Sequence, residues 1–494
     1  SAATGAGRAR RTQLPPSVEG RAVIARLLFS LMLLAFLPAM GRASTLVFCS
    51  EGMPESISPH LVTTTTGQNA ARQMFDTLID VKPGTTRLVP SLAQSWTVSD
   101  DGLVYTFALR EDVAFHSNAR FIPTRNMNAD DVIFSLERQR DAENPFFKSG
   151  GGQFPYFEDT GMPSLLKSIE KLDDHTIRLV LAVPDATFLA NLALPLSAVM
   201  SKEYADLLIE AGKPELLDTE PIGTGPFAFA DLMSDVTIRY RAFDKHWRGR
   251  PKIDTLVFSI TPNSSVRLNK LKVGECHVMA FPDPSDIAAI AANPDLELMQ
   301  LEGYNVGYLA MNVTKPPFDD VRVRLAVALA IDKQSIIDAV YRGSGVVAKN
   351  PLPPASWAYD DAIVDHPYDP DEAWALLSEA GYGDGLDTDL WYIPVNRPYS
   401  PNGKRIGEMI AADLERIGIR AHLVTKEWGP YRTALQNGEH TMALYGWTGD
   451  NPDPDNFLNI LLGCRSAGVG GNNVAKWCDP VYDALVSEAK TAAD

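Results

Sequence analysis

Positive charge is scarce in this 494-residue sequence, and that shortage excludes one class of partner. The chain has 45 Lys and Arg against 62 Asp and Glu, which gives a formal net charge of −17 at pH 7. Because a nucleic-acid-binding surface must be basic, no nucleic acid is expected as a partner. Apolar residues make up 45% of the chain and charged residues 22%, which is typical of a soluble globular protein with about two to four domains.

The sequence also lacks the common motifs of hydrolases and metal sites. It has no G-x-S-x-G nucleophile elbow and no H-E-x-x-H zinc motif. Its eight histidines are scattered, and its four cysteines form no C-x-x-C pair. The acidic run 450–455 could suggest calcium, but its two prolines and missing loop glycine do not fit an EF-hand. We therefore expect no metal, no cofactor and no enzymatic activity, and an exported hydrolase is the weaker alternative.

One glycine-rich segment has the spacing of a dinucleotide-binding loop. It is Gly223-Thr224-Gly225, followed by Pro226. The proline and the alternating Phe227 and Phe229 predict a strand after the glycines, whereas a phosphate site needs a helix N-terminus there. We therefore predict a turn rather than a nucleotide site.

Long apolar runs are lacking too, apart from one near the N-terminus. Residues 27–40 follow Arg21 and Arg26 and lead into Gly41-Arg42-Ala43, which places small residues at the −3 and −1 positions of a cleavage site. The run is too short for a membrane span. Residues 1–43 are therefore predicted to be an export signal that is cleaved after Ala43.

The small number of cysteines agrees with export. An even number in an exported chain favours disulfides. Cys464 and Cys478 enclose a glycine-rich loop and would make a local clip, whereas Cys49 with Cys276 would tie the first strand to a distant segment. The spacing alone leaves all three pairings of the four cysteines open.

The order of apolar patterns indicates an α/β fold. The first 300 residues hold scattered strands, and a long helix is predicted over 321–341. Strands and helices then alternate, which favours a parallel sheet with right-handed crossovers. The predicted elements of this alternation are a helix at 370–380, a strand at 390–395, a helix at 403–416, a strand at 419–424, a helix at 431–436 and a strand at 441–447.

Charged and aromatic side chains follow the three strands of this alternation. In open parallel sheets, ligands bind beyond the carboxyl ends of the strands, so these segments are expected to share one rim. Arg397 follows the first strand, Trp428 the second and Asp450 the third. A single Arg or Asp in a loop is more often a solvated charge. Opposed charges on one rim, however, suit a zwitterionic ligand.

Several segments in one order carry a resemblance that covers the chain from about Thr45 to its end. The chain resembles the family 5 extracellular solute-binding proteins of ABC importers. The resemblance implies an α/β, two-lobed periplasmic-binding-protein fold of type II, from the large cluster with an extra inserted subdomain, with the ligand in the cleft between the lobes. The segments that carry it are 46–52 (LVFCSEG), 90–93 (PSLA), 101–107, 221–227 (PIGTGPF), 254–262 (DTLVFSITP) and 446–451 (GWTGDN).

The resemblance also implies domain limits. The first lobe would consist of 44–76 and 220–302, with a subdomain at 77–219 inserted into it. The second lobe would be 303–494. Members of the family normally continue beyond this point and return to the first lobe, so we expect either that the sequence is truncated or that the return is missing here.

The resemblance assigns roles to the rim residues. Asp450 would hold the N-terminal ammonium of a dipeptide, and Arg397 would pair with its C-terminal carboxylate. Tyr399, Trp428, Trp447, Thr448 and Gly449 lie in or beside the same segments. The implied disulfides are Cys49–Cys276 and Cys464–Cys478.

The implied function is dipeptide transport. The resemblance predicts a periplasmic monomer that closes on a dipeptide and delivers it to a membrane ABC permease. Longer peptides or haem, carried by the same fold, are the alternative ligands.

Overall fold

The N-terminal strand β1 (Thr45–Ser50) lies inside a five-stranded sheet whose other members come much later in the chain. The computed structural model describes residues 43–491 except 84, 86, 302 and 452, and in it the sheet order is β11-β1-β10-β9-β8. β1 is parallel to β10, and β9 runs antiparallel between β10 and β8. The later strands are β8 (Phe227–Met233), β9 (Thr237–Ala242), β10 (Thr255–Ile260) and β11 (Val278–Met279).

The start of β8 confirms the prediction for the glycine-rich segment. Phe227 begins the strand directly after Pro226. Gly225 donates its backbone N–H to the carbonyl oxygen of Met74 at 2.9 Å, and a side chain at that position would overlap this backbone. The two glycines therefore serve a close backbone approach, and a strand rather than a helix follows them.

A second sheet is antiparallel and has the order β4-β5-β7-β6. On β5, Tyr105, Phe107 and Leu109 are buried and alternate with more exposed residues, as expected for a strand with one face on a core. Helix α3 begins after Asn128, whose side chain forms a capping box with Asp131. The elements are β4 (Ala93–Val98), β5 (Val104–Leu109), β6 (Leu166–Asp173), β7 (Thr176–Leu181), α3 (Ala129–Arg140) and the separate pair β2 (Ile79–Val81) and β3 (Leu88–Pro90).

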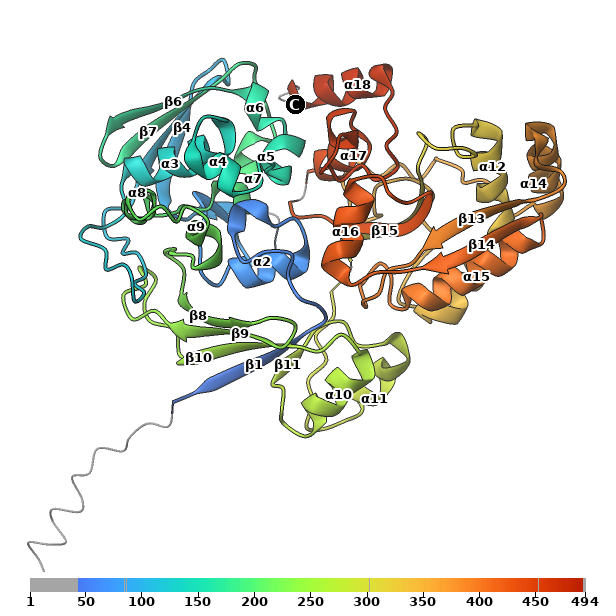
Figure 1. Cartoon of the computed structure of the whole chain (residues 1–494), viewed down its shortest axis with the longest axis horizontal. Helices are drawn as coiled ribbons and strands as arrows, with labels where there is room; N and C mark the ends of the chain where they lie inside the picture. Colours follow the sequence, from blue (N-terminus) through green and yellow to red (C-terminus); the bar gives the residue numbers. More distant parts are fainter. Residues whose placement is uncertain (1–42, 84, 86, 302, 452, 492–494) are drawn as a thin grey trace, which may run out of the picture. The chain divides into compact units, whose positions relative to one another are not determined.

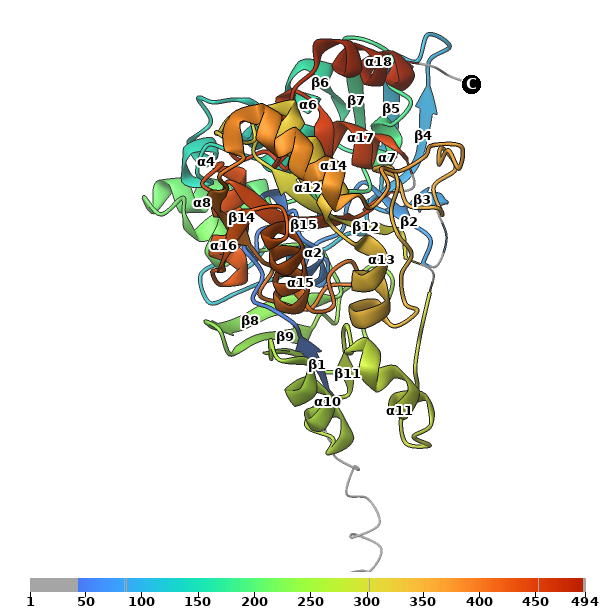
Figure 2. The same cartoon turned by 90° about the vertical axis from the view of Figure 1, so that its right-hand side faces the viewer.

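The third sheet contains the predicted alternation. Its order is β12-β15-β13-β14, and β13 is parallel to both β14 and β15 as predicted. Figure 1 labels β13, β14 and β15. β12, labelled in Figure 2, was not predicted; it runs antiparallel beside β15 at the edge of the sheet. Helix α15 packs on β14 and β13. The elements are β12 (Asn305–Met311), β13 (Leu386–Trp391), β14 (Ile419–Val424), β15 (Met442–Thr448), α15 (Gly403–Glu415) and α16 (Trp428–Gln436).

Two predicted elements differ most from the structure; in addition, the helix predicted at 431–436 begins earlier, as α16 (Trp428–Gln436), and the helix predicted at 370–380 ends earlier, as α14 (Pro370–Leu377). The predicted helix 321–341 is wrong as one helix: α12 (Val321–Ala330) ends at the extended Ile331, and Asp332 then caps a new helix, α13 (Lys333–Ile336). The strand predicted at 390–395 is β13, which ends at Trp391. The first residues of this strand were missed because Asp387 and Asp389 interrupt the apolar sequence. In the structure they are exposed positions of a strand whose other face is buried.

The remaining helices are mostly short. They are α2 (Thr65–Ala71), α4 (Pro145–Ser149), α5 (Pro155–Asp159), α6 (Met162–Leu165), α7 (Phe188–Asn191), α8 (Lys202–Glu210), α9 (Leu216–Thr219), α10 (Ser264–Lys272), α11 (Ile287–Ala291), α14 (Pro370–Leu377), α17 (Asp455–Leu462) and α18 (Pro480–Thr491). We call the elements up to β11 the first lobe and those from β12 onward the second lobe. Among the described residues, no helix is both long and apolar enough to cross a membrane.

Strand β15 belongs to both hydrophobic cores of the described residues. Met442 to Tyr445 pack in the core that surrounds β13 and α15. Trp447, only two residues beyond Tyr445, packs with Phe157 and Phe188 in the core of the first lobe. The end of β15 therefore lies where the two cores meet.

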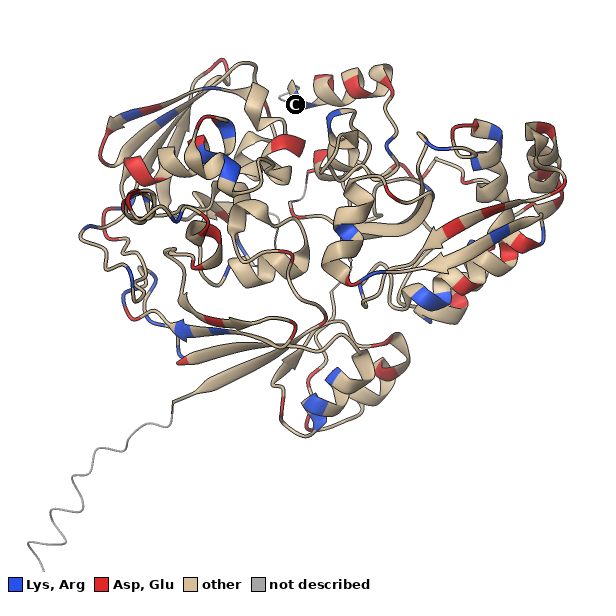
Figure 3. Ribbon diagram, in the orientation of Figure 1, with Lys and Arg blue, Asp and Glu red and all other residues tan. Residues whose placement is uncertain are grey.

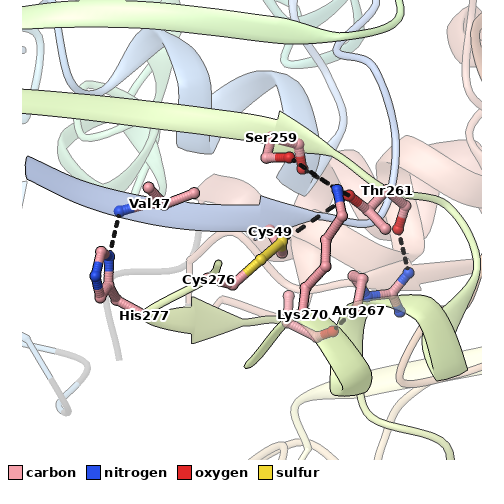
Figure 4. The surroundings of a disulfide bond; sticks show 9 residues. Val47, Cys49, Ser259, Thr261, Arg267, Lys270, Cys276 and His277 are labelled. Carbon is pink, nitrogen blue, oxygen red and sulfur yellow. Dashed lines mark hydrogen bonds between the residues drawn. A yellow bond between two sulfur atoms is a disulfide. The ribbon is translucent and has the colours of Figure 1, made fainter. Parts of the chain in front are cut away.

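The structure contains both disulfides that the resemblance implied. Cys49 on β1 is bonded to Cys276, with Cα atoms 5.9 Å apart, and Cys464 to Cys478, with Cα atoms 4.5 Å apart. Figure 4 shows that the first bond joins β1 to the segment just before β11. Beside it, His277 Nδ1 accepts a hydrogen bond from the backbone of Val47 at 2.9 Å.

Two predictions about chain organisation are not tested by the structure. The predicted leader 1–43 lies outside the described residues except for Ala43. Residues 45–494 form one compact unit by their contacts. The predicted divisions after 76, 219 and 302 stay predictions.

Candidate functional site

A small cavity lies at the end of β15. Its volume is about 20 Å³. Six of the seven binding residues predicted from sequence line it, and Gly449 does not. The lining residues are Thr63, Thr64 and Thr65 from the first lobe, and Arg397, Tyr399, Trp428, Arg432, Tyr445, Gly446, Trp447, Thr448 and Asp450 from the second.

Glycines allow the loop after β15 to fold tightly. A Cβ on Gly446 would overlap the ring of Tyr399, and a Cβ on Gly449 would overlap the rings of Tyr304 and Phe457. Asn456 on α17 then fixes the loop, because its Oδ1 accepts hydrogen bonds from the Asp450 backbone and from Trp447 Nε1, both at 3.0 Å. The loop therefore holds Asp450 in one position.

The carboxylate of Asp450 is bonded only by neutral side chains of the first lobe among the described residues. Gln68 on α2 donates from Nε2 to Oδ1 at 2.7 Å, and the hydroxyl of Tyr156 on α5 donates to Oδ2. Burial raises the pKa of Asp450 to about 6, although both hydrogen bonds act in the opposite direction. A carboxylate with no direct cationic partner in such a place is suited to receive a cation.

Arg397 lies beside an aromatic ring and a carboxylate. Its guanidinium carbon is 4.3 Å from the ring centroid of Trp428. Nη1 donates to Glu51 Oε1 at 2.6 Å, and Nη2 donates to Thr66 Oγ1 at 2.8 Å. Its Nε and the Nε1 of Trp428 are buried and have no hydrogen-bond partner in the described part of the chain.

A second guanidinium, that of Arg432, was not predicted from sequence. It donates to Thr63 Oγ1 at 2.6 Å, Asn472 Oδ1 at 3.0 Å and the Tyr445 hydroxyl at 3.2 Å, and its Nη1 lies 3.3 Å from Glu55 Oε1. Arg432 is four residues after Trp428 on α16, so both side chains lie on the same face of that helix. That spacing is the sequence signal that could have revealed it.

The first-lobe partners had no comparable signal. Tyr156 and Gln68 lie 294 and 382 residues from Asp450 in the chain. They come from short helices in which neither residue stands out by pattern or charge. Their role appears only when the two lobes are packed together.

A much larger cavity, of about 1840 Å³, lies nearby. It shares Arg397, Tyr399 and Tyr445 with the small one, and apolar side chains such as Met299 and Leu301 provide much of its lining. Of the predicted binding residues, only Arg397 and Tyr399 reach it. The small cavity is the candidate ligand site, because Asp450 and both guanidinium groups line it.

The fold and the site together define a class of protein. Side chains of the two lobes, some of them charged, line a small cavity here. This arrangement is typical of periplasmic binding proteins, whose lobes close by hinge motion. Residues 87–468 match the family described as bacterial extracellular solute-binding proteins, family 5, middle region. The chain belongs to this family, as the sequence predicted.

Individual relatives agree with this assignment. The chain is 49% identical over 454 residues to the "Dipeptide-binding protein" of Escherichia coli K12, covering 92% of this chain and 85% of that one. It is 47% identical over 447 residues to "Heme-binding protein A" of Haemophilus influenzae, covering 90% and 81%. The crystal structure of a dipeptide binding protein from Pseudoalteromonas sp. SM9913 in complex with Met-Leu superposes with a TM-score of 0.87 at 37% identity, covering 91% of this chain and 89% of that one. The predicted two-lobed type II fold is therefore confirmed.

Proposed function

We propose that this protein binds dipeptides in the periplasm and delivers them to an ABC permease in the membrane. One observation carries the proposal: among the described residues, the carboxylate of Asp450 has only neutral hydrogen-bond partners, and it lines a cavity that two guanidinium groups also line. A ligand with an ammonium at one end and a carboxylate at the other fits these charges. Relatives named as dipeptide-binding proteins support the same ligand class.

In this proposal, Asp450 holds the peptide ammonium and Arg397 binds the peptide carboxylate. Buried donors without a partner are rare in folded proteins. The Nε of Arg397 and the Nε1 of Trp428 are two such donors in the described residues, and a carboxylate oxygen would satisfy them. Tyr399, Trp447 and Thr448 would form the wall around the ligand, and Gly449, which does not line the cavity, would shape the loop that carries Asp450.

The size of the cavity implies motion. Its 20 Å³ is about the space of one water molecule and far less than a dipeptide needs. The lobes must therefore open to admit the ligand and close again around it, as in the hinge motion of periplasmic binding proteins.

Several features support export and binding rather than catalysis. The predicted leader 1–43 and the two disulfides suit an oxidising compartment outside the cytoplasm. The family consists of solute-binding proteins. We propose that the protein acts as a monomer and that the permease is its membrane partner.

Calorimetry with alanyl-alanine (Ala-Ala) tests the proposed function directly. The purified chain, freed of any bound ligand, is expected to bind Ala-Ala and to lose this binding when the amino group of the peptide is acetylated. Equal affinity for both peptides would contradict the role of Asp450. Mass spectrometry of whatever co-purifies with the native protein then identifies the natural ligand.

Haem is the second candidate, because one similar relative is named as a haem-binding protein. Titration of haem into the stripped protein, followed at the Soret band and repeated with excess Ala-Ala, separates the two candidates. Longer peptides are compared with Ala-Ala in the same calorimetric assay. Incubation with peptides, followed by a search for cleavage products, tests the exported-hydrolase alternative.

The affinity for Ala-Ala is expected to fall as the pH is lowered through about 6. Burial raises the pKa of Asp450 to about 6 in the ligand-free protein, so below that pH the carboxyl group must lose a proton before it can pair with an ammonium. The affinity should then fall by up to about tenfold for each pH unit. Calorimetry across this range measures the loss, and Asp450→Asn should remove this pH dependence. A flat profile in the unsubstituted protein would contradict the prediction.

A further inference from the structure

Arg397 already forms an ion pair with a carboxylate of the protein itself. Glu51, which directly follows β1, is 2% exposed, and its Oε1 accepts hydrogen bonds from Arg397 Nη1 and from Thr66 Oγ1, both at 2.6 Å. The Thr66 oxygen in turn accepts from Arg397 Nη2 at 2.8 Å. The three side chains form a closed triangle that joins the two lobes.

A further cation, that of Arg267, lies near this triangle and donates four hydrogen bonds to backbone carbonyl oxygens. Arg267, labelled in Figure 4, donates to the backbone carbonyl oxygens of Thr261, Pro262, Ala280 and Phe281. Burial lowers its pKa to about 10, while the charge of Glu51 acts to raise it. Arg267 therefore contributes positive potential around Glu51 but no hydrogen bond to it, and Arg397 is the cation that Glu51 contacts.

The other guanidinium that lines the cavity, that of Arg432, has a carboxylate partner that is held differently. Glu55 Oε1 accepts hydrogen bonds from the backbone N–H groups of Thr63 and Thr64, each at 2.8 Å, and Oε2 accepts from Thr64 Oγ1 at 2.6 Å. Its distance to Arg432 is 3.3 Å, longer than the 2.6 Å between Glu51 and Arg397. Glu55 therefore mainly holds the loop before α2, whereas Glu51 mainly neutralises Arg397.

We propose that Glu51 is a specificity-determining residue: it lowers the contribution that a free ligand carboxylate makes to the affinity of the site. This inference rests on the proposed function. In a buried site with a low dielectric constant, Glu51 repels a ligand carboxylate that approaches Arg397. Glu51 also occupies one of the N–H donors of Arg397 that the ligand carboxylate would use. Peptides whose C-terminal end is amidated, or continues as a longer chain, are then accepted nearly as well as a free dipeptide.

The test compares two ligands that differ only at this end, Ala-Ala and its C-terminal amide. Calorimetry gives the Kd of each for the unsubstituted protein and for Glu51→Gln, which keeps the shape of the side chain and removes its charge. In Glu51→Gln the ratio of the amide Kd to the free-acid Kd is expected to rise at least about tenfold, because the charged hydrogen bond between ligand and Arg397 is no longer opposed.

Two control variants locate the effect. Glu55→Gln removes the carboxylate that lies beside the other guanidinium, that of Arg432, and should leave the ratio unchanged. Adding Arg397→Gln to Glu51→Gln should bring the ratio back to that of the unsubstituted protein. A folded Glu51→Gln variant with an unchanged ratio overturns the inference. If Glu51→Gln does not fold, Glu51→Asp replaces it: its shorter side chain draws the carboxylate away from Arg397, and an unchanged ratio again overturns the inference.

The same titrations separate failure of this inference from failure of the proposed function. If the unsubstituted protein binds neither Ala-Ala nor its amide, the proposed function is wrong and the inference falls with it. If the unsubstituted protein binds both and only the ratio fails to respond to Glu51→Gln, the proposed function stands and Glu51 has no part in specificity.

Discussion

Asp450→Asn is expected to lower the affinity for Ala-Ala by roughly a hundredfold or more, because a buried ammonium without its charged partner costs about 3–5 kcal/mol. Asparagine keeps the shape of the side chain, and its oxygen can still accept a hydrogen bond from Gln68 or Tyr156. The loop itself is held by Asn456 through the backbone of Asp450 and the indole of Trp447. We therefore expect the loss in binding and not in folding, measured by calorimetry and by the thermal unfolding midpoint.

The matched control for this variant is Asp389→Asn. Asp389 is an exposed aspartate on β13, in the same lobe, and does not line the cavity. Its substitution should change neither the affinity nor the unfolding midpoint. An Asp450→Asn variant that binds as well as the unsubstituted protein would remove Asp450 from the proposed role, and an equal loss in both variants would point to a general effect of charge.

The second-lobe half of the site could be predicted because it follows from strand order. Arg397, Trp428 and Asp450 each follow one of three parallel strands, so the topology alone brings them to one rim. β15 is a continuous apolar run up to Trp447 and β14 alternates apolar residues with Arg420 and His422, and the predicted limits of both strands lie within one residue of the observed ones.

The first-lobe half of the site could not be predicted in the same way. Glu51, Gln68 and Tyr156 lie in loops or short helices that carry no long periodic pattern. Their partners are hundreds of residues away, and only the packing of one lobe on the other brings them together. Sequence reasoning therefore assigned two opposed charges to the rim, whereas the structure adds the carboxylate of Glu51 against Arg397.

The same limit explains the missed features of the fold. β12 pairs with β15 across more than a hundred residues, and its sequence contains polar and glycine residues that weaken the strand pattern. The break in the predicted helix 321–341 depends on one capping aspartate, Asp332, inside an otherwise helical apolar pattern. Local chemistry that ends an element is harder to detect than periodicity that continues it.

The buried pair of Arg138 and Asp218 should contribute more to stability than any exposed ion pair. Arg138 on α3 is 0% exposed, and its Nη atoms make three hydrogen bonds of 2.9–3.1 Å to the carboxylate of Asp218 on α9. Arg138→Met is expected to lower the free energy of unfolding by about 3–5 kcal/mol, because Asp218 stays buried without its cation. Burial, the larger of the two causes that lower the pKa of nearby His60 to about 3, persists in Arg138→Met and disfavours His60 as a replacement cation.

An exposed pair of the same chemistry separates burial from charge as the cause. Arg420 on β14 donates to both carboxylate oxygens of Asp387 on β13 at 2.8 and 2.7 Å, on two strands where Figure 3 shows acidic and basic residues as neighbours. Both side chains of this pair are 55% exposed, so Arg420→Met should lower the free energy of unfolding by about 1 kcal/mol or less.

Urea unfolding followed by circular dichroism measures the loss of stability in both variants. If Arg138→Met loses no more stability than Arg420→Met, the buried pair does not hold α3 to α9 as its geometry implies. A large loss confined to Arg138→Met would attribute the difference chiefly to burial, because both pairs engage two carboxylate oxygens, through three hydrogen bonds in the buried pair and two in the exposed one.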